Sequence, residues 1–260
     1  MNKSLIKKFH LFFTSAFIFL IHVPFVFAKI KSPSGASSGI ADIKLTSISS
    51  GIVFTNENPS LNRRGIYDSL GLSALGLSRQ AYEYAIKGFN YLWSIGKLND
   101  NKIISIVDFS LPSSKKRLFI LDLKNYKLLF NTYVAHGRNS GKEVATEFSN
   151  KEESYQSSLG FYVTQETYSG KHGYSLHLEG EEHGINDNAR NREIVMHSAP
   201  YVNESLIRSQ GYIGRSQGCP ALSESVHKPI IEKIKNGTCL FLYSPNRFYA
   251  THSRILQVAS

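Results

Sequence analysis

The residues of this sequence best suited to covalent chemistry are Cys219 and His197. Cys219 stands in a Ser-Gln-Gly-Cys-Pro stretch, and His197 lies near the end of the apolar run EIVMHSA. A cysteine attacks a carbonyl carbon only as its thiolate, so it needs a nearby base or positive charge. An imidazole at a sheet edge beside the turn could accept the thiol proton. The pair therefore indicates a Cys–His site for acyl transfer.

The glycine before the cysteine strengthens this interpretation. Gly218 can adopt backbone conformations that are closed to other residues. Successive backbone N–H groups in such a turn can converge on a negatively charged oxygen. Acyl transfer passes through an intermediate that carries such an oxygen, so the turn fits the chemistry of the pair.

A disulfide between Cys219 and Cys239 is the first alternative. Exported proteins meet oxidising conditions, in which two cysteines of one chain can pair. Cys239 opens the apolar stretch CLFLYS and is typical of a small core residue, whereas Cys219 is flanked by glycine and proline. The spacing alone does not decide between a disulfide and a reactive thiol.

A zinc site is the second alternative, because histidines and acidic residues gather between positions 172 and 197. Zinc peptidases also cut cell-wall peptides. The sequence has no HExxH motif, however, and the spacings match no compact ligand set. A zinc site therefore stays the less favoured alternative. The residues of this alternative are His172, His177, Glu179, Glu181, Glu182, His183, Asp187 and His197.

Around these residues the sequence follows the period of β-strands. An apolar stripe with helical spacing runs through residues 61–98, and a second helix is expected at 223–235, before Asn236-Gly237. The pattern predicts a mainly β domain with helical additions at its start and after the cysteine. The stripe consists of Leu77, Ala81, Ala85, Phe89 and Leu92. Strands are expected at 103–109, 117–123, 127–135, 160–168, 174–180, 193–199 and 239–244.

The first 60 residues differ in composition from the rest. Residues 1–28 combine three lysines with an uncharged stretch that ends Val-Phe-Ala, and they are expected to be a signal peptide cleaved after Ala28. An uncleaved membrane anchor is the alternative. The expected location is therefore the periplasm or cell envelope. The remaining divisions are a Ser/Gly-rich linker at 29–60, a helical segment at 61–100, a catalytic domain at 101–246 and a tail at 247–260.

The chain carries an excess of basic residues. Its formal net charge is +10, and removal of the expected signal peptide would lower the charge to +7. An exported protein with this charge suits an anionic polymer of the cell envelope. Nucleic acid is the usual alternative partner of a basic chain, and the expected export argues against it. The charge also fits solubility alone, so it does not identify a partner by itself.

Several blocks of the sequence resemble the murein L,D-transpeptidases, in which a His followed by a small residue precedes Ser-x-Gly-Cys. His197-Ser198 and Ser216-Gln217-Gly218-Cys219 fit this signature. The resemblance runs roughly from Tyr67 to Tyr243, and it looks closest to the branch with a GRSxGCPA motif. It implies a β-sandwich catalytic domain. The other matching blocks are VAHGRNSG (134–141), FSN (148–150), SSLGFY (157–162), GKHGYSLHLEG (170–180), NDNARNREIVMHSA (186–199) and GRSQGCPAL (214–222).

The resemblance implies a reaction on tetrapeptide stems of peptidoglycan. Cys219 would attack the carbonyl at the L-centre of the diamino acid and expel terminal D-alanine, while His197 moves the proton. The backbone carbonyl of Ser198 would orient the imidazole. The N–H groups of Gln217, Gly218 and Cys219 would form the oxyanion hole. The reaction implied by the resemblance needs neither a metal nor an organic cofactor.

The acceptor that resolves the thioester stays open. An amine of another stem, a D-amino acid or an envelope protein would make the chain an L,D-transpeptidase. Water would make it an L,D-carboxypeptidase. A non-catalytic peptidoglycan-binding protein with the same fold is a further alternative, although a binder has no need of a thiol in a turn.

The sequence departs from the family pattern at two positions that help to hold the substrate. Gln217 stands where many relatives have histidine, and Ala221 where many have arginine or asparagine. We expect Arg215 to provide the missing positive charge. Further residues expected to bind substrate are Ser216, Tyr174, His177 and Tyr201, with Glu179 and Asp187 as weaker candidates to line the cleft. His136, which precedes Gly137, is expected to be a structural loop residue.

Overall fold

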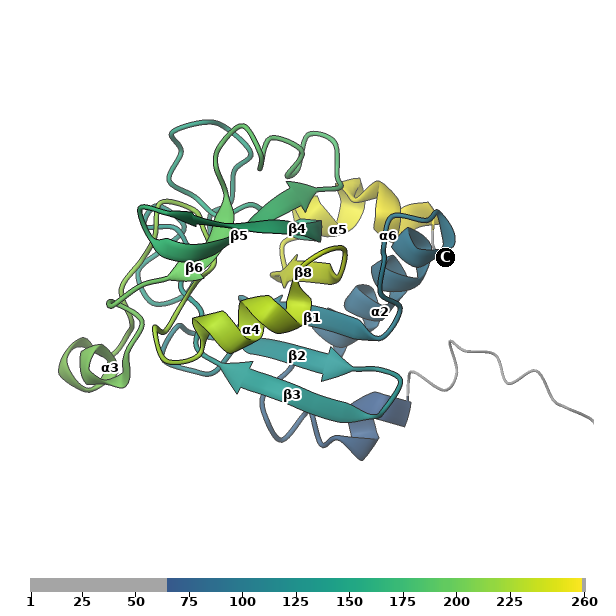
Figure 1. The fold of residues 1–260 in the computed structure, drawn as a ribbon, viewed down its shortest axis with the longest axis horizontal. Coiled ribbons are helices and arrows are strands. Elements are labelled where there is room, and N and C mark those ends of the chain that lie inside the picture. The colour runs from purple at the N-terminus through teal and green to yellow at the C-terminus, as the bar shows by residue number, and fades with distance from the viewer. Residues whose placement is uncertain (1–64, 259–260) are drawn as a thin grey trace, which may run out of the picture. The chain divides into compact units, whose positions relative to one another are not determined.

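The computed structural model of the chain describes residues 65–258 (Figure 1). The signal peptide expected at 1–28 and the linker expected at 29–60 lie outside these residues and stay predictions. Within 65–258, no helix has both the length and the apolar character needed to cross a membrane.

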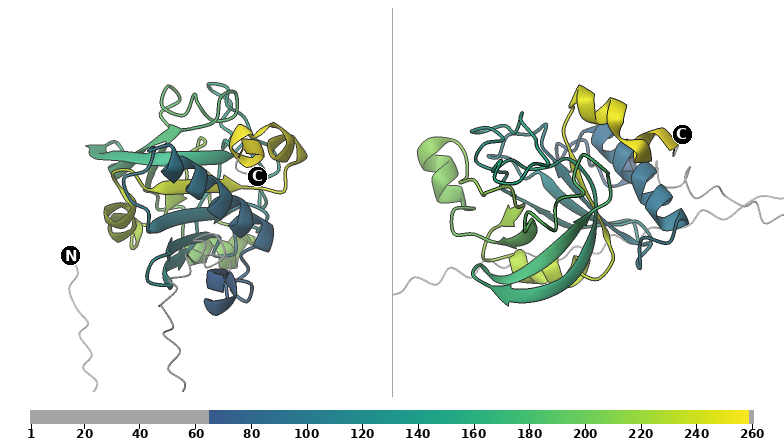
Figure 2. Two further views of the ribbon diagram at one scale, coloured as in Figure 1. Left: turned by 90° about the vertical axis from the view of Figure 1, so that its right-hand side faces the viewer. Right: turned by 90° about the horizontal axis from the view of Figure 1, so that it is seen from above.

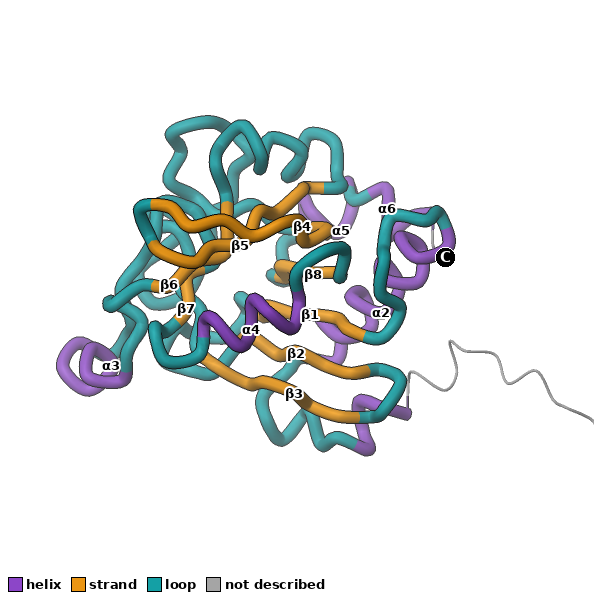
Figure 3. The backbone as a smooth tube through the Cα atoms, in the orientation of Figure 1, coloured by secondary structure: helices purple, strands orange, loops and turns teal. Residues whose placement is uncertain are grey.

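Eight strands form one curled sheet, which confirms the expected mainly β fold class (Figure 3). Their spatial order is β3-β2-β1-β8-β4-β5-β6-β7, so the last strand of the chain lies in the middle of the sheet. The strands are β1 (Ile103–Asp108), β2 (Leu118–Asp122), β3 (Lys127–Thr132), β4 (Gly160–Gly170), β5 (Gly173–Gly180), β6 (Val195–Ser198), β7 (Ala221–Leu222) and β8 (Cys239–Tyr243).

The centre of the sheet is buried on both faces. Strand β1 pairs in parallel with β8, with Ile106 opposite Phe241, and every residue of both strands is buried. A strand of this kind needs cover on both sides. Helices α2 (Arg79–Ser94) and α4 (His227–Ile234) provide it from opposite faces, and both contact β1 (Figures 1 and 2).

Helix α2 contains four of the five residues of the apolar stripe that the sequence indicates, whereas Leu77 lies just before its N-cap. All five residues of the stripe are buried. Ser78 caps the first turn, because its side-chain oxygen accepts a hydrogen bond from the N–H of Ala81 at 3.0 Å. Gly88 faces the ring of Phe161, where a Cβ atom would lie 2.0 Å from the nearest ring carbon. The helix can therefore approach the sheet closely.

The other helices differ from expectation in their extent. Helix α4 begins at His227, four residues later than the expected start at residue 223. Helix α3 (Glu204–Gln210) lies between β6 and β7, and no apolar pattern announces it because none of its residues is buried.

The C-terminal segment is not the expected tail. Residues 247–258 form two short helices, α5 (Arg247–His252) and α6 (Arg254–Val258). The side chains of Tyr249, Ile255 and Leu256 are buried in the main core, and α6 contacts α2. The segment is part of the folded domain because its apolar side chains complete that core.

Candidate active site

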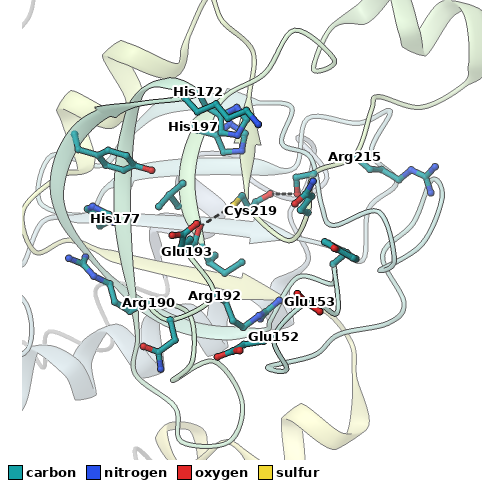
Figure 4. Close-up of a pocket in the computed structure, with 18 of the residues that line it drawn as sticks. Glu152, Glu153, His172, His177, Arg190, Arg192, Glu193, His197, Arg215 and Cys219 are labelled. Carbon is teal, nitrogen blue, oxygen red and sulfur yellow. Dashed lines mark hydrogen bonds between the residues drawn. The ribbon is translucent and has the colours of Figure 1, made fainter.

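Most of the expected site residues border an open cavity of about 1130 Å³ (Figure 4). Cys219 and His197 both line it, together with Tyr201 and Arg215. Residues of the β4–β5 hairpin and of the segments 152–155 and 190–195 form further parts of the wall. Elements that are far apart in the sequence therefore meet at the cysteine.

Strand pairing places the histidine near the cysteine. His197 lies on β6, which pairs in parallel with β7 so that His197 stands opposite Ala221, two residues after Cys219. The Nδ1 atom of His197 lies 2.8 Å from the carbonyl oxygen of Ser198. Because a carbonyl only accepts, Nδ1 carries the proton and Nε2 keeps a free lone pair. This matches the role that the family resemblance implies for Ser198.

The surroundings of His197 favour its neutral form. Burial lowers the pKa of His197, and the nearby charges of His172 and His227 act in the same direction, while the Ser198 hydrogen bond opposes them. The ring of His172, on the β4–β5 hairpin, stacks on the His197 ring with centroids 4.5 Å apart. A neutral imidazole is the form that can accept a proton.

The thiol of Cys219 is free and partly buried. Burial raises its pKa, while a hydrogen bond from the Val195 N–H and, after it, the positive charge of Arg192 oppose this rise. The thiol donates to the carbonyl oxygen of Glu193, with Sγ and oxygen 3.7 Å apart. The resting pair therefore consists of a neutral thiol and a neutral imidazole, and the proton must move when the cysteine attacks.

The turn of residues 215–219, called the cysteine turn below, depends on a glycine. Gly218 has φ of +126°, and a Cβ atom there would lie 2.9 Å from the carbonyl oxygen of Gln156. The hydroxyl of Ser216 closes the turn, since it donates to the Cys219 carbonyl at 2.6 Å and accepts from the Gly218 N–H at 3.1 Å. Ser216 thus shapes the turn in addition to lining the cavity.

This geometry changes the expected oxyanion hole. The N–H of Gly218 is engaged with Ser216 and is not directed at a substrate. The N–H groups of Gln217 and Cys219 donate to no backbone carbonyl in the described part of the chain. These two remain as candidate donors.

A buried arginine and histidine support the cysteine turn from behind. The N–H of Ser216 donates to the His136 carbonyl at 2.9 Å. The His136 ring lies between an Nη2 atom of Arg117, 2.6 Å from Nδ1, and the Gly141 carbonyl, 3.1 Å from Nε2. Burial and the charge of Arg117 lower the pKa of His136 to about 3. His136 is thus a neutral structural residue of this loop.

Arg215 does not provide the positive charge expected beside the cysteine. Its guanidinium donates to the carbonyls of Arg138 and Gly141, each at 3.2 Å, and points away from Cys219 (Figure 4). Arg192 has that place instead. The sequence offers no signal that separates Arg192 from Arg190 two positions earlier, because both precede β6 in one polar segment.

Of the three aromatic residues expected to bind substrate, two line the cavity and one does not. His177 and Tyr201 line the cavity, and His177 stacks on Tyr168 with ring centroids 4.4 Å apart. Tyr174 does not line it, because its hydroxyl donates to Glu232 of α4. Successive side chains of a strand alternate between faces, so Tyr174 and His177, three positions apart on β5, point to opposite sides.

The residues of the two alternatives do not form the sites that those alternatives require. Cys219 and Cys239 are both free, and Cys239 is buried in β8. Within residues 65–258, no three His, Cys, Asp or Glu side chains are grouped so as to hold a metal ion. The weaker cleft candidate Asp187 accepts from Asn150 at 2.7 Å and lies outside the cavity wall.

Three solved structures show the kind of protein that the chain is similar to. An L,D-transpeptidase from Mycobacterium smegmatis is 13% identical over 55% of this chain and 59% of that chain, with a TM-score of 0.33. One from Mycobacterium tuberculosis H37Rv is 13% identical over 55% and 58%, with a TM-score of 0.32. One from Stackebrandtia nassauensis is 15% identical over 71% and 77%, with a TM-score of 0.34. The chain thus spans 59% of the first of these structures.

Comparison with curated proteins gives no match. A family model of the L,D-transpeptidase catalytic domain matches residues 73–243, which is more than half of the chain. The family expected from the sequence is thereby confirmed, while the GRSxGCPA branch stays a prediction. The chain belongs to the L,D-transpeptidase catalytic domain family.

Proposed function

We propose that the chain is an exported cysteine acyltransferase that acts on peptidoglycan stem peptides as an L,D-transpeptidase. The observation that carries this proposal is that His197 on β6 pairs with the strand that follows Cys219, and that both side chains line one open cavity. The Ser198 carbonyl fixes the imidazole so that Nε2 is the nitrogen able to take a proton. Family membership supports the same reaction class.

The first half-reaction would form a thioester. Nε2 of His197 takes the thiol proton as Sγ of Cys219 bonds to the substrate carbonyl carbon. The carbonyl oxygen becomes an oxyanion, which the N–H groups of Gln217 and Cys219 can receive, each contributing about 3–4 kcal/mol. The intermediate collapses as the C–N bond breaks, and the imidazolium protonates the departing amine of D-alanine.

The second half-reaction would resolve the thioester with an amine. Nε2 of His197 accepts the proton of the attacking amine, the new amide bond forms, and the C–S bond breaks. The sulfur then takes the proton back from the imidazolium. Water in place of the amine gives a free carboxylate by the same steps, which is the carboxypeptidase alternative.

The cavity suits an extended peptide that carries both signs of charge. Its volume exceeds the roughly 300–1,000 Å³ that is usual for small-molecule sites. The basic residues Lys171 and Arg190 and the acidic residues Glu152 and Glu153 all line it. A stem peptide with carboxylates and a side-chain amine could meet both sets of charges.

A direct assay tests the proposal. The chain should release D-alanine from disaccharide-tetrapeptides and, when a D-amino acid is added, join it to the stem; mass spectrometry reads both products. Cys219→Ala and His197→Ala should each lower turnover by about 1,000-fold or more, and the double variant should be no worse, since the pair acts as a unit.

The buried thiol supplies the matched control. Cys239→Ser lies in the core strand β8 and should remain active. Hydrolysis without transfer would favour the carboxypeptidase. Retained turnover in Cys219→Ala with loss on chelation would replace the mechanism by a zinc peptidase, and binding of stems without any turnover would indicate the non-catalytic alternative.

A further inference from the structure

Arg192 lies at the base of the cavity, immediately before the residue whose carbonyl accepts from the thiol. It lines the cavity with Cys219 and comes from the turns that precede β6 (Figure 4). The position of a Cβ atom on Gly218 would be 3.4 Å from its Nη2 atom. The next residue, Glu193, accepts the Cys219 hydrogen bond. The side chain of Arg192 and the backbone after it thus flank the cysteine turn.

The guanidinium group uses its donors on one loop, residues 149–158. The Nη1 atom donates to the carbonyl of Ser149 at 2.8 Å and to the hydroxyl of Ser158 at 2.5 Å. The Nη2 atom donates to the carbonyl of Gln156 at 2.7 Å and to the hydroxyl of Ser154 at 3.2 Å. All four partners are neutral, so these hydrogen bonds do not neutralise the positive charge, and the negative charge of Glu152 acts on it without a hydrogen bond. Only the planar fork of arginine can make such a set.

The loop held in this way has unusual backbone geometry. Glu153 and Tyr155 have φ of +54° and +56°, a region that side chains other than glycine rarely adopt. Such conformations persist where surrounding contacts fix them. The Arg192 partners Ser154 and Gln156 directly follow the two strained residues in the sequence. Both strained residues line the cavity.

The 149–158 loop also supports the cysteine turn. The hydroxyl of Ser157 donates to the carbonyl of Gly218 at 3.1 Å, and the carbonyl of Gln156 lies against Gly218. If the loop moved, Gly218 would move with it, and Cys219 directly follows Gly218.

We propose that Arg192 is a positioning residue of the acyl-transfer site: it fixes the 149–158 loop against the cysteine turn and keeps a positive charge beside the sulfur. The inference rests on the proposed function of Cys219. The charged and titratable groups around the thiol are Arg192 and Glu193 before β6, His197 on β6 and Tyr201 after it. Arg192 is the cation among them that favours the thiolate.

Two substitutions separate the charge from the shape of the side chain. Arg192→Gln removes both, whereas Arg192→Lys keeps the charge without the fork. Arg208→Gln, at an exposed arginine of α3 paired with Glu204, is the matched control. The measurements are the pH dependence of Cys219 alkylation by iodoacetamide, the rate of protease cleavage within 149–158, and kcat/KM for D-alanine release.

Arg192→Gln should move the alkylation midpoint to higher pH, because the thiolate loses its cation. It should also lower kcat/KM by about 10- to 100-fold, because the site loses its geometry. Arg192→Lys should keep the midpoint near that of the wild type while still speeding loop cleavage and lowering kcat/KM. Arg208→Gln should match the wild type in every measurement.

A double variant keeps the test decisive if Arg192→Gln does not fold. Ser154→Ala with Ser158→Ala leaves the charge in place and removes two of the four acceptors. It should speed loop cleavage and lower kcat/KM without moving the midpoint. The inference would be overturned if folded Arg192→Gln kept the wild-type alkylation midpoint. It would also be overturned if protease cleaved the loop of the double variant no faster than that of the wild type. Alkylation and cleavage need no substrate, so a wild type that releases no D-alanine would count against the proposed function alone.

Discussion

The two reacting side chains are both held in their neutral forms by burial. Burial raises the pKa of Cys219 and lowers the pKa of His197. A preformed thiolate–imidazolium pair would need shifts of the opposite sign. The site is therefore built for transfer of the proton during attack, with His197 as a general base that must be neutral to act.

The lowered pKa of His197 predicts how kcat/KM falls on the acid side of the pH profile. Since the pKa of His197 is lowered, kcat/KM should stay high as the pH falls through 6.5 and decline only below it. His172→Gln removes a neighbouring positive charge and part of the cover, so its acid limb should move toward higher pH. Initial rates of D-alanine release across the pH range measure both. A wild-type midpoint at or above 6.5 would contradict the argument.

At this scale the sequence predicted the reacting pair but not its surroundings. The types of Cys219 and His197 and the glycine before the cysteine are enough to suggest their chemistry. The prediction that Arg215 places its charge beside the cysteine was wrong, because hydrogen bonds to the 138–141 loop direct its guanidinium elsewhere. The prediction that Tyr174 binds substrate was wrong for a different reason, since strand register decides which side chains of β5 face the cavity.

Among the elements, the cysteine turn is the one most sensitive to a small change. Gly218 combines a positive φ with close contact to the Gln156 carbonyl, and the Ser216 hydroxyl bonds to the backbone of both Gly218 and Cys219. A side chain at position 218 would have to displace the backbone of the 149–158 loop. The conformation and the packing both require glycine there.

Gly218→Ala should therefore lower kcat/KM by about 100-fold or more through displacement of the nucleophile. It should also lower the free energy of unfolding by about 1–3 kcal/mol. Gly211→Ala, at the end of α3, is the control, because Gly211 has φ of +88° and no atom within 4 Å of the Cβ position. It should cost stability and leave kcat/KM unchanged. Equal kcat/KM in the two variants would show that the close contact at Gly218 is unimportant; urea unfolding gives the stability term.

The strands and the main helix follow from local patterns, whereas their arrangement does not. Alternation and apolar runs predicted all strands of five residues or more. No local pattern predicts that β8 lies between β1 and β4, because that pairing depends on contacts between distant segments. Helices α5 and α6 were missed because a helix of five or six residues is too short to show an apolar stripe.

Across the whole molecule, one buried carboxyl group connects the sheet with the C-terminal helices. The Oε2 atom of Glu182 accepts from the N–H of Phe161 on β4 at 2.8 Å and from the hydroxyl of Tyr249 on α5 at 3.0 Å. Its Oε1 atom accepts from the hydroxyl of Ser253, between α5 and α6. Residues 247–258 are thus held by polar contacts as well as by their apolar side chains.

Burial raises the pKa of Glu182, so the folded state holds this proton more tightly than the unfolded state does. The resulting contribution to stability is present below the ordinary value of 4.5 and is lost as the pH rises through the folded-state pKa.

Glu182→Gln keeps an oxygen for Phe161 and Tyr249 and cannot ionise. Its free energy of unfolding, relative to the wild type, should therefore increase between pH 4.5 and pH 8. Glu182→Ala leaves three donors unpaired and should lose about 3 kcal/mol or more at pH 4.5, where the wild-type carboxyl is protonated. Urea unfolding at several pH values measures both differences, and a Gln variant that tracks the wild type at every pH would show that Glu182 carries no ionisation penalty in the fold.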